Sequence, residues 1–136
     1  MSAGKRVASI VVLPSESRVD TTSPEFINDQ FRGAEFIVRQ TAQGSTIAFV
    51  SVKVQGKVVG STQYYTVATI TPATSPAFTK RLVLYPGAST ANNSTTLEPA
   101  AAPYVANEFL PARWRVTSTN ASTSAATFSV SADLYH

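Results

Sequence analysis

Few side chains in this 136-residue sequence could carry out a reaction. The one histidine, His136, is the last residue, and there is no cysteine, so a triad has no internal histidine base and a metal has no thiolate ligand. The acidic residues fall mostly in segments without regular patterning, and the cluster from Glu16 to Asp29 lacks the spacing of a calcium loop. We therefore predict a protein that is not an enzyme and has no catalytic, cofactor-binding or metal-binding residues.

The only tryptophan, Trp114, lies between Arg113 and Arg115. An aromatic ring beside cations could stack on a nucleic-acid base or a sugar. Side chains alternate between two faces along a strand, however, so Trp114 shares one face with Val116 while the two arginines share the other. The alternation favours a buried tryptophan, with Arg113 and Arg115 directed outward toward a partner.

Tyrosines and a few basic residues are the predicted contact residues. Tyr64 and Tyr65 are adjacent in one predicted strand, so one of them must point out of the core, and tyrosine is enriched at interfaces. The net charge of +3 comes from scattered residues rather than a block of like charges, which argues against a nucleic-acid partner. The interface candidates are Lys5, Arg6, Tyr64, Tyr65, Tyr104, Arg113 and Arg115.

Charged residues make up only 14% of the chain, against about a quarter in an average globular domain. Such a surface either packs against neighbours in an assembly or is simply polar without charge, and composition leaves both interpretations open. The apolar run from Val7 to Leu13 is too short to span a membrane and lacks a signal-peptide cleavage site. We expect no membrane partner and a cytosolic product without a secretion signal of its own.

Short alternating segments separated by turn residues predict about seven or eight strands. The predicted strands cover residues 5–13, 33–41, 46–55, 63–70, 78–85, 110–117 and 125–134, with a further short apolar pair at Val58 and Val59. The predicted core positions on two of them are Ala48, Val50, Val52 and Val54, and Phe128, Val130, Ala132 and Leu134. Because no helical segment is available for parallel crossovers, the pattern favours an all-β fold, an antiparallel β-sandwich that is jelly-roll-like.

The predicted organisation is a single globular domain with a distinctive beginning. Residues 1–32 are expected to form an N-terminal strand or arm followed by a long loop, and residues 33–136 the β-sandwich. Pro14 ends the first strand in this prediction, and the loop that follows has room for one helical turn at Pro24–Phe26. Residues 88–110 are the longest segment expected to be irregular.

Four segments together carry a resemblance. They are Gly33–Val38 (GAEFIV), Val54–Lys57 (VQGK), Arg81–Gly87 (RLVLYPG) and Leu110–Val116 (LPARWRV). In this order they resemble a group of small proteins encoded among the virion structural genes of tailed bacteriophages. The resemblance spans about Gly33 to Leu134 and leaves residues 1–31 outside it.

The resemblance implies a non-enzymatic virion protein whose partner is the major capsid protein or another virion protein. Within that group a capsid decoration (cement) protein that stabilises the head is the favoured expectation, and a homo-oligomer is implied, with a trimer as one option. The alternatives are a neck or tail component, and a carbohydrate-binding head-fibre or receptor-binding module that uses Tyr64, Tyr65, Trp114 or the 88–110 segment. A glycan-binding module should expose a flat aromatic platform, so burial of Trp114 would count against it.

Overall fold

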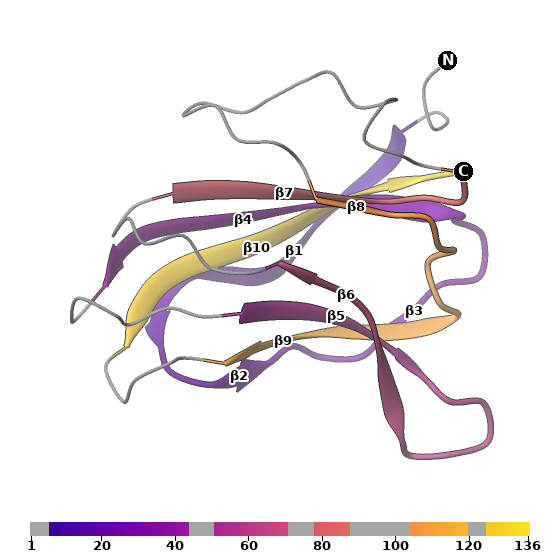
Figure 1. Cartoon of the computed structure of the whole chain (residues 1–136), viewed down its shortest axis with the longest axis horizontal. Helices are drawn as coiled ribbons and strands as arrows, with labels where there is room; N and C mark the ends of the chain where they lie inside the picture. Colours follow the sequence, from indigo (N-terminus) through magenta and orange to yellow (C-terminus); the bar gives the residue numbers. More distant parts are fainter. Residues whose placement is uncertain (1–5, 44–50, 71–77, 88–103, 120–124) are drawn as a thin grey trace.

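The computed structural model describes residues 6–43, 51–70, 78–87, 104–119 and 125–136, and every structural statement below concerns these residues. They form ten strands and no helix, arranged as two layers (Figure 1). One sheet has the order β1-β10-β4-β7-β8, and the other has the order β2-β9-β5-β6, with β3 also paired to β9. The strands are β1 (Arg6–Arg18), β2 (Thr21–Thr22), β3 (Phe26–Ile27), β4 (Gly33–Gln43), β5 (Ser51–Lys57), β6 (Tyr64–Ile70), β7 (Phe78–Leu84), β8 (Tyr104–Ala106), β9 (Arg113–Thr119) and β10 (Ala126–Tyr135).

The pairing pattern is that of a long hairpin rolled up on itself. β1 pairs with β10, β2 and β3 with β9, β4 with β7, and β5 with β6 at the middle of the chain, and every one of these pairs is antiparallel. Successive pairs alternate between the two sheets, which is the jelly-roll arrangement. The predicted all-β sandwich of jelly-roll type is therefore confirmed, although the described residues hold ten strands rather than seven or eight.

The predicted loop after Pro14 is wrong. β1 continues through Pro14 to Arg18, and β2 and β3 follow where a loop with a helical turn at Pro24–Phe26 was expected. Pro14 is accommodated because β1 is an edge strand and its pairing with β10 shifts register between Leu13 and Glu16. A proline removes no ladder hydrogen bond at such a bulge.

Two further predictions need correction. β5 covers Ser51–Lys57 and so runs two residues past the predicted strand end at residue 55, while residues 46–50, with Ala48 and Val50, lie outside the described residues. The segment 88–110 contains β8, which pairs with β7 in parallel. At three residues, β8 is too short to show a period of two.

Alternation along the longer strands sets the core. β10 and the interior of β9 alternate between buried and half-buried residues, as predicted, and Val52 and Val54 are buried on β5. Trp114 is only 1% exposed, and its ring stacks on Phe26 at 4.5 Å and meets the edge of Phe36, from the other sheet, at 5.5 Å. The largest fully buried side chains are Trp114, Phe36, Phe128, Ile70, Leu82, Leu84, Gln40, Val38, Val52, Val54 and Val116. The predicted burial of Trp114 is confirmed.

Candidate interaction surface at the β5–β6 hairpin

The hairpin between β5 and β6 projects from one end of the sandwich, where β3 and the start of β9 also lie (Figure 1). Its loop is closed by two backbone hydrogen bonds, from Val58 N to Gln63 O at 2.9 Å and from Ser61 N to Val58 O at 3.1 Å. Gly60 has φ of 74°, which suits the third position of a type II turn. Val59 precedes it at the apex and is 95% exposed. An apolar, β-branched side chain is thus held outward at a position where turns usually carry polar residues.

The base of the hairpin is packed through Gly56. This residue lies opposite Tyr65 on β6 and opposite Trp114 on β9. A Cβ atom added at Gly56 would lie 2.7 Å from Pro111 Cγ and 2.7 Å from the Tyr65 ring. Only glycine lets the Tyr65 ring and Pro111 approach the strand this closely. The hairpin is therefore fixed against the segment that leads into β9.

A single carboxylate, Glu25, ties three strands together on the outer face of the same sheet. The Tyr64 hydroxyl donates a hydrogen bond of 2.5 Å to Glu25 Oε1, and Arg113 Nη1 donates to Oε2 at 3.1 Å. Lys57 Nζ lies 3.7 Å from Oε1. Glu25 immediately precedes β3, while the three partners come from β6, β9 and β5.

Arg115 covers the Tyr64 ring from β9. Its guanidinium carbon lies 3.6 Å from the ring centroid, and its Nε donates to Gln55 Oε1 at 2.9 Å. A cation over an aromatic face contributes about 0.5–1 kcal/mol at an exposed site. Tyr64 is therefore held at its hydroxyl by Glu25 and at its face by Arg115, and it lies along the outer surface of the sheet rather than pointing into solvent.

The hydrogen bond between Tyr64 and Glu25 shifts both groups away from their ordinary pKa values. It lowers the pKa of Glu25 below 4.5, with further lowering from Arg113 and Lys57, while burial acts in the opposite direction. The same bond is the main reason that the pKa of Tyr64 is raised above 10.0. The ionised carboxylate and the neutral phenol are the forms that this arrangement stabilises.

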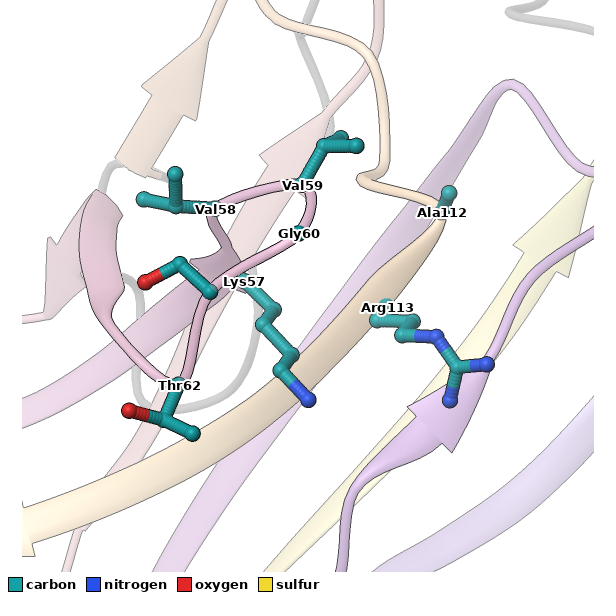
Figure 2. A pocket seen from close by; sticks show the side chains of 8 residues that line it. Lys57, Val58, Val59, Gly60, Thr62, Ala112 and Arg113 are labelled. Carbon is teal, nitrogen blue, oxygen red and sulfur yellow. The ribbon is translucent and has the colours of Figure 1, made fainter.

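A hollow of about 690 Å³ lies beside the turn. Its apolar lining comes from Val58, Val59 and Ala112, and Figure 2 shows the Lys57 and Arg113 side chains directed to the same side of the turn. The remaining lining residues are Gly60, Ser61 and Thr62. The hollow thus combines apolar side chains with two cations, which suits an apolar group that carries a carboxylate.

The structure brings three of the predicted interface residues together and places a fourth, Tyr65, apart from them. Tyr64, Arg113 and Arg115 meet around Glu25, whereas Tyr65 lies at the hairpin base and is 48% exposed. Lys5, together with the side chains of Arg6 and Tyr104, lies outside the part that the structure describes.

Sequence reasoning missed Glu25, Lys57 and Val59. Glu25 was assigned to a loop of solvated acids, because nothing in its neighbours reveals that β3 pairs with β9. The apolar pair Val58-Val59 between two glycines was a usable signal, since apolar residues are unusual at the tip of a hairpin.

No group of three His, Cys, Asp or Glu residues within the described ranges could hold a metal ion. No helix among these residues is long and apolar enough to cross a membrane. No protein-family model, curated protein or solved structure matches the chain. The fold therefore defines the class, a jelly-roll β-sandwich, and the hairpin end is its candidate interaction surface.

Proposed function

We propose that this chain is a non-enzymatic structural protein of a tailed-bacteriophage virion, and within that class a capsid decoration protein that stabilises the head through protein–protein contacts. The observation that carries the proposal is the apolar hairpin tip, with Val59 95% exposed, on a base locked by Gly56 and Glu25. Fully burying a valine stabilises a complex by about 1.5–3 kcal/mol relative to leaving it in water. A rigid tip loses little conformational entropy when it binds, so most of that gain remains available.

The segments that carry the family resemblance add support. They fall largely on β4, β5, β7 and β9, and these strands form two neighbouring pairs, β4 with β7 and β5 with β9. Segments far apart in the sequence thus form inner strands of each sheet. This placement is expected for motifs that a group of proteins shares because they specify its fold. Jelly rolls are common in viral capsid proteins, although fold alone does not specify function.

The carbohydrate-binding alternative has less support. Trp114 is buried in the core, and Arg115 covers the Tyr64 ring. Tyr65 remains as a half-exposed tyrosine, but its ring packs over Gly56 and Pro111. A flat, open aromatic platform, which sugar stacking requires, is not formed by these three side chains.

The copy number in purified particles of the phage or prophage that encodes this protein tests the proposal. Quantitative mass spectrometry should find hundreds of copies per particle, and adding the purified protein to particles that lack it should raise their resistance to heat. A ring of about six or twelve copies would instead place it at the neck or tail. Absence from the particles would refute the virion proposal.

A further inference from the structure

A second exposed apolar group lies in the segment that leads into β9. Phe109 is 64% exposed, although the next residue, Leu110, is buried. The backbone is fixed here, because Leu110 N donates to Arg32 O at 2.7 Å and Asn28 Nδ2 donates to Leu110 O at 3.1 Å. Phe109 is therefore not a side chain on a loose loop, and it is held outside the core.

The residue before it, Glu108, is also exposed and has no hydrogen-bond or ion-pair partner among the described residues. Glu108 and Phe109 together form a protrusion, which we call the knob, with an aromatic ring and an adjacent carboxylate. Phenylalanine is enriched at protein interfaces, and a carboxylate beside it is favourable there where the partner supplies positive charge. Phe109 stays largely exposed, and the Glu108 carboxylate stays without a partner as far as the described residues show.

The hollow beside the hairpin turn has the matching composition. Val58 and Val59 provide apolar surface, and Lys57 and Arg113 provide two positive charges. Both cations contact the one carboxylate of Glu25, so this group of three keeps a net charge of +1. One further carboxylate would neutralise it. The hollow, of about 690 Å³, is open to solvent, so a side chain from a second molecule can enter it.

We propose that the knob of one copy of this protein binds in the hollow of a second copy. The Phe109 ring packs on Val58 and Val59, and the Glu108 carboxylate approaches Lys57 and Arg113. The knob and the hollow lie at the same end of the sandwich, since Phe109 is three residues from Ala112, which lines the hollow. Two copies can therefore exchange knobs about a two-fold axis, or pass them on around a small ring.

This contact takes up Val59, the same exposed tip that supports the proposed function, so in this oligomer the protein–protein contact made by the tip is with a second copy. Failure of the self-association would leave the virion proposal standing, and absence from virions would leave the self-association standing. The two proposals are thus tested separately.

Sedimentation velocity of the purified full chain tests the contact. The protein should associate into one defined oligomer as its concentration rises to about 100 µM, which is enough to populate a contact of micromolar affinity. Val59→Asp removes apolar surface from the hollow and adds a charge that repels Glu108, while Phe109→Ser removes the ring of the knob. Each should weaken association by at least about 30-fold, as expected for the loss of a central anchor.

Matched controls separate this surface from exposed apolar residues in general. Val11→Ser and Val19→Ser alter valines that are 65% and 46% exposed. Val11 lies on β1 in the other sheet, and Val19 precedes β2, which pairs with the end of β9 far from Arg113. Both variants should associate like the wild type. Circular dichroism of every variant should show the same strand content, so that a monomer is not mistaken for an unfolded chain.

Mixing the two disruptive variants gives the sharpest result. Val59→Asp keeps an intact knob and Phe109→Ser keeps an intact hollow, so an equimolar mixture should associate more tightly than either variant alone. A wild-type monomer at the highest concentration would overturn the proposal. So would an oligomer that both variants leave unchanged, or a mixture that associates no more tightly than either variant alone.

Discussion

Replacing Trp114 by alanine should lower the free energy of unfolding by about 3–5 kcal/mol, the usual cost of emptying a large aromatic site in a core. Trp114 is 1% exposed, and its ring lies between Phe26 from β3 and Phe36 from the other sheet. The substitution therefore removes a contact between the sheets and a contact that fastens β3 to β9. We expect the loss to fall in the upper part of the range.

The structure allows the magnitude to be worked out. A buried tryptophan removes about 150–250 Å² from water, which corresponds to about 4–6 kcal/mol at 25 cal/mol per Å². The alanine methyl group retains part of this burial, and the unfolded chain is already partly compact, so the transfer contribution is smaller than that figure. Two aromatic contacts add about 0.5–1.5 kcal/mol each. The expected loss of unfolding free energy for Trp114→Ala therefore remains several kcal/mol.

Urea unfolding followed by far-ultraviolet circular dichroism is the appropriate assay, because the substitution removes the only tryptophan fluorophore. Trp114→Phe is the control. It keeps a ring between Phe26 and Phe36 and should lose clearly less stability than Trp114→Ala. A loss of unfolding free energy below about 1 kcal/mol for Trp114→Ala would refute the reasoning, because the cavity left by a buried tryptophan costs more than that.

Two other predictions concern β1 and the Glu25 cluster. Deleting residues 1–14 should abolish cooperative urea unfolding, because Val12 and Leu13 are buried and β1 pairs along β10; a truncated chain that still unfolds cooperatively would make β1 dispensable. The lowered pKa of Glu25 adds stability above pH 4.5, and this stability disappears as the pH falls through the folded pKa of Glu25. The raised pKa of Tyr64 adds stability below pH 10.0, and this stability disappears as the pH rises through the folded pKa of Tyr64. The stability difference between the wild type and Glu25→Gln should therefore shrink in acid. The absorbance of the Tyr64 tyrosinate can be obtained as the difference from Tyr64→Phe, and it should appear at lower pH in Glu25→Gln than in the wild type. Unchanged Tyr64 titration in Glu25→Gln would contradict the hydrogen bond.

Strand alternation made much of the fold predictable. The buried faces of β9 and β10 follow from a period of two, which also placed Trp114 inside and Arg113 outside. The short strands were not predictable, because β2 and β3 have two residues each and β8 has three. They exist only because a longer strand already lies beside them.

The candidate site was predictable in its parts but not in its arrangement. Tyr64, Arg113 and Arg115 could be named because aromatic and basic residues are frequent at interfaces. The acid that joins them could not, since Glu25 lies 39 residues from Tyr64 and 88 from Arg113. The hollow could not be predicted for the same reason, because it is formed by two segments that are far apart in the sequence, residues 57–62 and Ala112 with Arg113.

The sequence by itself determined the all-β class and the burial of Trp114, because alternation is a local property that each strand carries in its own residues. Only the tertiary structure decided which strands are neighbours, and so which side chains from distant segments share a surface. Pairing in a jelly roll joins the two ends of the chain, as β1 and β10 do, and no short-range pattern encodes such a contact. The Glu25 cluster and the hollow beside Val59 follow from that pairing.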